Sequence, residues 1–162
     1  MIVRAETPAD WPLIRAVQEA AFPGPGEAAL IDQLRVDGAL RLSLVAVEGD
    51  EVIGHAAFSQ MQAPFRALGL GPVGVRPDRQ GTGAGTQLVK AGLEQAEAQG
   101  WQGAFVLGDP RYYGRFGFQV GQAAGFQCRY AGPHFMAMAL GSETLPVSTG
   151  DLAYPAAFDA LD

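Results

Sequence analysis

The stretch that most constrains the fold is a glycine-rich turn at 80–85, placed between an apolar run and a helical pattern. The run at 70–75 is apolar, with β-branched residues at Val73 and Val75, and is typical of a buried strand. After the glycines, apolar residues recur with helical spacing at Val89, Leu93 and Ala96. The first turn of a helix leaves backbone N–H groups without partners and carries the positive end of the helix dipole. The pattern therefore predicts a turn that can bind a phosphate or pyrophosphate.

Three phosphate-binding motifs compete for this turn. A P-loop needs a Lys directly after its glycines, but the only Lys in the chain is Lys90. The dinucleotide fingerprint G-x-G-x-x-G has another spacing and belongs near the start of a domain. The pattern Gln80-x-x-Gly83-x-Gly85, preceded by Val75-x-Pro77, resembles the acetyl-CoA-binding motif of the GCN5-related N-acetyltransferase (GNAT) superfamily. Taken alone, the loop also allows an ordinary glycine-rich turn from strand to helix.

Length and composition predict one domain over residues 1–162, with a sizeable core. The net charge of −6 argues against nucleic acid or a membrane as the main partner and is compatible with an amine. One cysteine, Cys128, excludes an intramolecular disulfide, and a small buried thiol is the expected role. Charged residues interrupt the N-terminal stretch, and no apolar run approaches a membrane span, so we expect a cytoplasmic protein. No metal site is expected.

Periodicity and turn signals predict a mixed α/β order of elements. The expected elements are strand 2–5, helices 8–21 and 27–37 joined by a Pro/Gly hinge, strands 42–47 and 52–61 joined by a hairpin turn, strand 67–75, helix 83–99, strand 104–107, a short helix at 109–116, and strands 118–120 and 135–140. Beyond residue 140 the pattern is weak. This C-terminal tail, 141–162, is expected to pack back on the domain through Tyr154 and Phe158.

A second motif makes the resemblance specific. Tyr113 lies four residues before Gly117-Phe118, the spacing found in the family after the strand that follows the cofactor helix. The segment 108–118 is also similar to the string G-D-P-x-Y-Y-x-R-F-G-F of a bacterial subgroup of acetyltransferases. The resemblance implies an α/β (α+β) GNAT fold: a mixed, mostly antiparallel sheet, splayed at its central parallel strand pair and flanked by helices. One departure is Val106, which stands where many members have an Asn that reaches the pantetheine arm.

The resemblance also implies how acetyl-CoA would bind as co-substrate. The pantetheine arm would pair with backbone groups of Val73 and Val75. The pyrophosphate would be held by backbone N–H groups of Gln80, Gly81, Thr82, Gly83, Ala84 and Gly85. A neutral amine would attack the thioester directly, and Tyr113 would give the leaving thiolate a proton or hydrogen bond. A core Tyr with a satisfied hydroxyl is the alternative role for Tyr113.

The base that deprotonates the amine is less well defined. His55 has a suitable unperturbed pKa, but it lies on an apolar strand, where a structural His is as plausible. Glu27 borders the Pro/Gly hinge, where a helix-cap carboxylate is the alternative. Asp109 is typical of a helix N-cap, and a water chain to bulk solvent is a further option.

Three functions are compatible with these patterns. The first is an acyl-CoA-dependent N-acyltransferase that acts on a small-molecule or protein amine. The second is a module that binds acyl-CoA without turnover, as a sensor or partner. The third is another glycine-loop nucleotide binder. Variable loops supply the acceptor site in this fold, so the acceptor stays open, and the resemblance also allows a homodimer.

Overall fold

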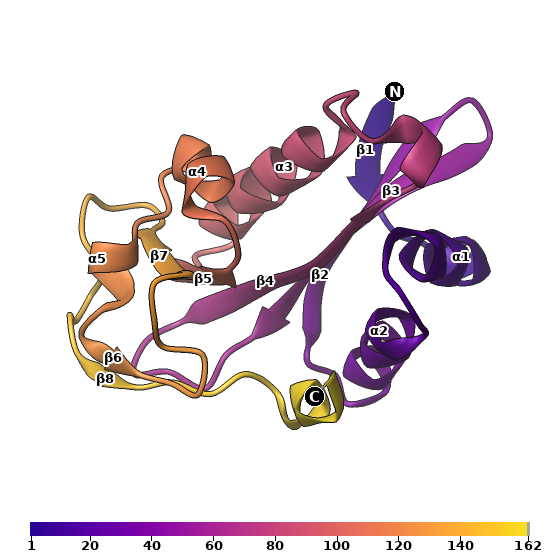
Figure 1. The fold of residues 1–162 in the computed structure, drawn as a ribbon. Helices are drawn as coiled ribbons and strands as arrows, with labels where there is room; N and C mark the ends of the chain where they lie inside the picture. The colour runs from indigo at the N-terminus through magenta and orange to yellow at the C-terminus, as the bar shows by residue number, and fades with distance from the viewer. Residues whose placement is uncertain (162) are drawn as a thin grey trace. The chain divides into compact units, whose positions relative to one another are not determined.

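The computed structural model describes residues 1–161, which form a central sheet with helices and a smaller two-stranded sheet (Figure 1). The strands are β1 Ile2–Ala5, β2 Leu40–Glu48, β3 Glu51–Gln60, β4 Ala67–Val75, β5 Gly103–Leu107, β6 Phe126–Gln127, β7 Phe135–Ala139 and β8 Gly150–Asp151. The α-helices are α1 Trp11–Ala21, α2 Gly26–Val36, α3 Ala84–Ala98, α4 Pro110–Tyr113 and α5 Val120–Ala123. Short 3-10 turns are Pro8–Asp10, Pro77–Arg79, Gly114–Phe116 and Ala156–Leu161.

The main sheet has six strands in the order β1-β2-β3-β4-β5-β7. β1 pairs antiparallel with β2 and β5 antiparallel with β7, whereas β4 and β5 run parallel. The parallel pair is joined through α3, as a crossover connection requires. This is the mixed, mostly antiparallel sheet flanked by helices that the sequence predicts.

The chain groups into two compact units, and β4 contributes residues to both. The first contains Met1–Phe58, Gly71–Gly92 and the part of the chain after residue 155. The second contains Ser59–Leu70 and Leu93–Pro155. A single domain over the whole chain remains a prediction.

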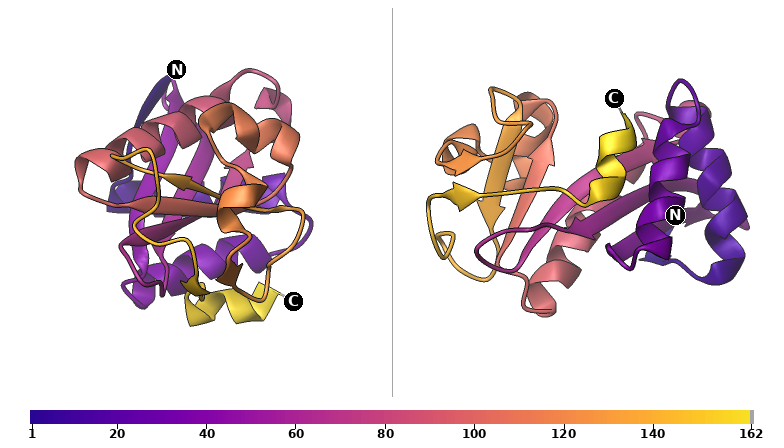
Figure 2. Two further views of the ribbon diagram at one scale, coloured as in Figure 1. Left: turned by 90° about the vertical axis from the view of Figure 1, so that its left-hand side faces the viewer. Right: turned by 90° about the horizontal axis from the view of Figure 1, so that it is seen from below.

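In the first unit, helices cover both faces of the sheet (Figure 1). α1 and α2 bury Ile14, Val17 and Ile31 against strand residues such as Val45. α3 lies on the opposite face, where a Cβ atom added at Gly92 would come within 2.2 Å of the Phe58 ring. The absence of a side chain at residue 92 therefore lets α3 approach the sheet closely. The C-terminal 3-10 turn, in which Phe158 is buried, runs beside α2 (Figure 2).

In the second unit, the core is built on aromatic rings from β5 and its neighbours. Phe105 stacks on Phe135 of β7 with ring centroids 5.6 Å apart, and it meets Phe126 edge-on at 5.5 Å. Leu152 is buried in the same core and Tyr154 packs against it. These contacts account for the position of the C-terminal tail up to residue 155.

The predicted strand at 118–120 is wrong. Only Gln119 pairs, as an isolated bridge to Ala137, and Val120 begins the single helical turn α5. The turn forms because it buries Ala123 in the aromatic core. The two-residue strands β6 and β8 were not predicted either, since such short segments carry no periodic signal.

Candidate functional site

The glycine loop adopts a backbone that requires glycine at two positions. Gly81 and Gly83 have φ angles of 79° and 91°, in the region that side chains disfavour. A Cβ atom at either position would meet nothing within 4 Å, so backbone conformation and not packing explains these glycines. The N–H of Gln87 donates to the carbonyl of Gly83 at 3.0 Å, where α3 begins. The N–H groups of Ala84 and Gly85 therefore have no acceptor within the helix, which is the arrangement that binds anions.

Side chains join this loop to the end of β4 and to the 3-10 turn Pro77–Arg79 that follows the strand. Gln80 donates through Nε2 to the carbonyl of Val75 at 3.2 Å. Thr82 donates through Oγ1 to the carbonyl of Arg79 at 2.6 Å. The predicted phosphate-binding residues 80–85 thus form one ordered turn between β4 and α3.

Two arginines flank the loop, and both are already paired with carboxylates. Arg76 bonds Asp78 at 2.8 Å and Glu51 at 3.0 Å. Arg79 bonds Glu48 at 3.1 Å. A phosphate would have to compete with these carboxylates for either guanidinium, so the backbone N–H groups are the more direct ligands.

Strand β4 pairs with β5 over only part of its length. The register joins Ala67–Leu70 of β4 to Gly103–Val106 of β5, whereas β4 continues to Val75. Pro72 has no N–H to donate. Val73 and Val75 are half-buried, and Gly74 between them is buried. The stretch 71–75 is thus the part of the strand left for other pairing.

Tyr113 ends the one-turn helix α4, which Asp109 caps. Oδ1 of Asp109 accepts a hydrogen bond from the N–H of Arg111 at 2.9 Å, which confirms the N-cap role expected for it. A Cβ atom at Gly108 would lie 2.5 Å from the Tyr113 ring, so this glycine makes room for the ring. The ring also meets Phe118 edge-on at 6.0 Å.

The surroundings of the Tyr113 hydroxyl keep it protonated at neutral pH. Within residues 1–161 no protein group hydrogen-bonds it. Burial of the half-buried side chain raises the pKa of Tyr113 to about 12. At neutral pH the phenol is therefore a donor with an open position, which a leaving thiolate could occupy.

His55 lies on β3 and is completely buried. Its Nδ1 accepts from Nε2 of Gln18 at 2.8 Å, and its Nε2 lies 2.7 Å from Oγ of Ser43. Burial lowers the pKa of His55 to about 4. A neutral ring with both nitrogens engaged favours a structural role over direct proton abstraction.

Glu6 and Glu27, two carboxylates of the first unit, differ in their surroundings. Glu6 accepts from Arg35 at 2.8 Å and from the Trp11 indole at 2.6 Å, and it also bonds Ser43. Burial raises the pKa of Glu6, but the bonds from Arg35 and Ser43 outweigh it and hold the pKa below its ordinary value. Glu27, in the first turn of α2, is half-buried and makes no hydrogen bond or ion pair to the rest of residues 1–161. Of these two, Glu27 is the one available to a ligand.

The burial of His55 gives a testable pH dependence. Because the folded pKa of about 4 lies below the ordinary 6.5, its contribution to stability is complete above pH 6.5 and is lost as the pH falls toward 4. From pH 7 to pH 5 the free energy of unfolding should fall by about 2 kcal/mol. Glu6 and Asp10 titrate below their ordinary values of 4.5 and 3.8, outside this window. Urea unfolding at both pH values measures the loss, and His55→Gln should remove most of it. If His55→Gln showed the same fall in the free energy of unfolding, a group other than His55 would cause the pH dependence.

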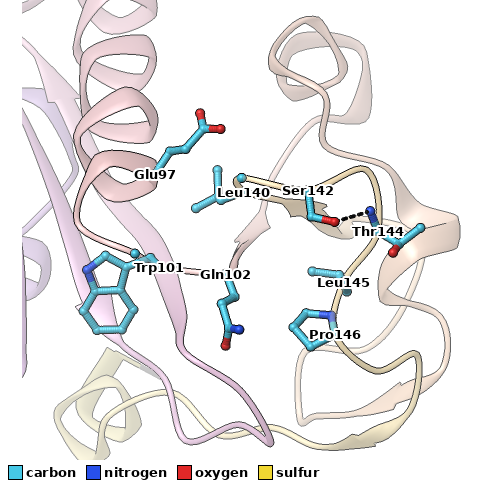
Figure 3. A pocket seen from close by; sticks show the side chains of 10 residues that line it. Glu97, Trp101, Gln102, Leu140, Ser142, Thr144, Leu145 and Pro146 are labelled. Atoms are coloured by element: carbon cyan, nitrogen blue, oxygen red, sulfur yellow. Dashed lines mark hydrogen bonds between the residues drawn. The ribbon is translucent and has the colours of Figure 1, made fainter.

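The second unit contains a hollow of about 450 Å³ that no sequence motif indicated (Figure 3). It is lined by the end of α3 and the segment after β7, namely Glu97, Gly100, Trp101, Gln102, Leu140, Gly141, Ser142, Thr144, Leu145 and Pro146. Ser142 accepts from the N–H of Thr144 at 3.5 Å across one wall. No residue predicted for the site lies there.

Residues 1–161 lack two further features, a cluster of metal ligands and a membrane-spanning helix. No group of three or more His, Cys, Asp or Glu residues could hold a metal ion in this part of the chain. None of its helices is both long and apolar enough to cross a membrane.

The glycine loop, the partly paired β4 and the sheet order together define a class of protein. The acetyltransferase (GNAT) family matches residues 11–118. The chain therefore belongs to the GNAT family and is an N-acetyltransferase with the GNAT fold.

Two relatives cover nearly the whole chain. The uncharacterized N-acetyltransferase YhbS of Escherichia coli (strain K12) is 36% identical over 160 residues, which are 95% of this chain and 96% of that protein. The crystal structure of E. coli YhbS in complex with CoA has a TM-score of 0.91 at 34% identity, covering 98% of this chain and 91% of that one. A GNAT family acetyltransferase from Brucella melitensis in complex with acetyl-CoA has a TM-score of 0.83 at 40% identity, covering 98% and 97%.

Proposed function

We propose that this chain transfers the acetyl group of acetyl-CoA to a primary amine of a small molecule or a protein, by direct attack of the amine. The observation that carries the proposal is the loop at 80–85, whose positive-φ glycines lead into the N-terminus of α3. The relatives from E. coli and B. melitensis, crystallised with CoA and acetyl-CoA, support the choice of co-substrate.

The cofactor would be held mainly by backbone groups. N–H groups of Gln80, Gly81, Thr82, Gly83, Ala84 and Gly85 would bind the pyrophosphate at the helix N-terminus. Backbone groups of Val73 and Val75 would pair with the pantetheine arm, because the β5 register ends before them. Such pairing would add the arm to the exposed edge of β4 and orient the thioester without any charged side chain.

Acyl transfer then needs one new bond, one broken bond and one proton moved. The amine lone pair attacks the thioester carbonyl carbon, and the carbonyl oxygen becomes an oxyanion that a backbone N–H of β4 can stabilise. Collapse re-forms the carbonyl and breaks the C–S bond. The nitrogen loses a proton, and the thiolate gains one from Tyr113, which bulk solvent then reprotonates. The products are an N-acetyl amide and CoA with a free thiol.

Glu27 and His55 remain the two proposed bases, and they can be separated. Glu27→Gln should lower kcat/KM for the amine about tenfold at pH 7, since the candidate base is lost. The dissociation constant of CoA should not change. Glu19→Gln is the matched control, because Glu19 is an exposed carboxylate on α1 that pairs with Arg15. Equal rates for both variants would exclude Glu27 and leave His55 or a water chain to deprotonate the amine.

The experiment that tests the function measures free thiol. Purified protein incubated with acetyl-CoA and a panel of primary amines and peptides should release CoA in an amine-dependent manner. Calorimetry with CoA, NAD and ATP identifies the nucleotide that binds. Tight binding of CoA without thiol release for any acceptor would favour the sensor function. The burial of His55 supports that function, because it argues against one of the two candidate bases.

A further inference from the structure

Gln18 lies on α1 with its side chain toward β4, and the two polar atoms of its carboxamide have different surroundings. The residue is completely buried. Its Nε2 donates to Nδ1 of His55, but among residues 1–161 its Oε1 has no hydrogen-bond partner. That oxygen lies against Gly74, because a Cβ atom added there would be 2.6 Å from it. A bare carbonyl oxygen thus faces the backbone of β4.

A chain of hydrogen bonds fixes the direction in which this oxygen points. The amide nitrogen of Gln18 can only donate, so Nδ1 of His55 accepts and the ring proton is on Nε2. That proton is donated to Ser43, which leaves the Ser43 hydroxyl to donate to Glu6. Turning the amide over would require the other His55 tautomer and would cost the bond from Ser43 to Glu6. The four side chains therefore hold Oε1 toward β4.

Leaving this oxygen unpaired is unfavourable. A buried acceptor without a partner costs roughly 1–3 kcal/mol, so such a group in a native structure calls for a physical reason. The position supplies one. Gly74 separates Val73 from Val75, the two residues proposed to align the thioester arm. Because Gly74 has no side chain, the carboxamide of Gln18 can contact the backbone of β4 directly.

We propose that Gln18 is a positioning residue for acyl transfer, which acts through Gly74 on the backbone of Val73 and Val75. The inference rests on the proposed function of these two valines. Contact with the Gln18 carboxamide fixes the distance between α1 and β4. The backbone groups that meet the thioester are then held in one place, and a displacement of about 1 Å at a reacting centre can cost as much as 100-fold in rate.

The test replaces the carboxamide while keeping its length. Gln18→Met should lower kcat about tenfold, expressed per CoA-binding site counted by calorimetry, with the dissociation constant of CoA within about twofold of wild type. Counting sites removes the effect of misfolded protein. Ser43→Ala removes the hydrogen bonds to His55 and Glu6 that orient the Gln18 carboxamide but keeps the carboxamide itself, so kcat should fall in the same direction but less. Ser59→Ala is the control, because Ser59 is a completely buried serine of β3 whose hydroxyl has no hydrogen-bond partner in the described chain.

A double-mutant cycle tests the contact itself. In Gly74→Ala the new methyl group would collide with Oε1 of Gln18 and lie 3.2 Å from the Ala21 Cβ. Gln18→Ala should relieve part of that collision, so the double variant should be no slower than the slower single variant. Strictly additive losses, or unchanged kcat per site in both Gln18→Met and Ser43→Ala, would overturn the proposal.

A second readout does not depend on turnover and separates this inference from the proposed function. Amide NMR signals of Val73, Val75, Gly81 and Gly83 should all shift in the wild type on addition of acetyl-CoA. In Gln18→Met the responses at 73 and 75 should be reduced by about half or more, while those at 81 and 83 persist. An inactive wild type would refute the transferase function, yet unchanged responses at all four amides would still refute the role of Gln18.

Discussion

Replacing Tyr113 with phenylalanine should lower kcat for acetyl transfer about 100-fold, the contribution expected of a general acid. The dissociation constant of CoA should stay within about threefold of wild type, because the loss concerns the leaving group and not the bound cofactor. Stopped-time assays of thiol release give kcat, and calorimetry gives the dissociation constant.

The physical reason lies in the environment of the phenol. Burial raises the pKa of Tyr113 to about 12, so the hydroxyl keeps its proton through the pH range in which amines react. Phenylalanine retains the ring that packs on Gly108 and Phe118 but removes the only transferable proton of the side chain. The rate should therefore fall without a loss of folding. Ionisation of Tyr113 should also leave the wild-type rate unaffected below about pH 11.

Tyr112→Phe is the matched control for this prediction. Tyr112 precedes Tyr113 on the same turn, and the two rings meet edge-on at 5.0 Å. The control should keep kcat within about twofold of wild type. If Tyr113→Phe behaved like the control, the tyrosine would be a packing residue and another group would protonate the thiolate.

The sequence predicts the fold best where local pattern and tertiary contacts agree. The strand at 67–75 is confirmed residue for residue, and the helix predicted at 83–99 is observed as Ala84–Ala98. Both carry long apolar patterns that end at glycine or proline. The failure at 118–120 has the opposite cause. A three-residue segment is too short to show a helical or strand period. The burial of Ala123 in the aromatic core instead favours a helical turn there.

The candidate site also has a part that the sequence predicts and a part that it does not. Glycine spacing predicts the loop, because positive φ at Gly81 and Gly83 is a local requirement that the residue type reveals. The surroundings of His55 could not be predicted, because they bring together residues distant along the chain, Gln18 and Ser43, on α1 and β2. The same holds for the approach of Gln18 to Gly74. A buried histidine and a catalytic one have the same sequence signal until their neighbours are known.

Gly83→Val should abolish most CoA binding, raising the dissociation constant at least about 100-fold, or roughly 3 kcal/mol. Valine strongly disfavours the φ of 91° at this position, and its branched side chain would occupy the space in front of the N-terminus of α3. Calorimetry with CoA measures the change. Gly38→Val imposes a similar strain at φ 72°, in a turn after α2 with nothing within 4 Å, and should lower stability without weakening CoA binding. Equal weakening in both variants would mean that strain alone acts, and unchanged affinity in Gly83→Val would place the pyrophosphate outside the loop.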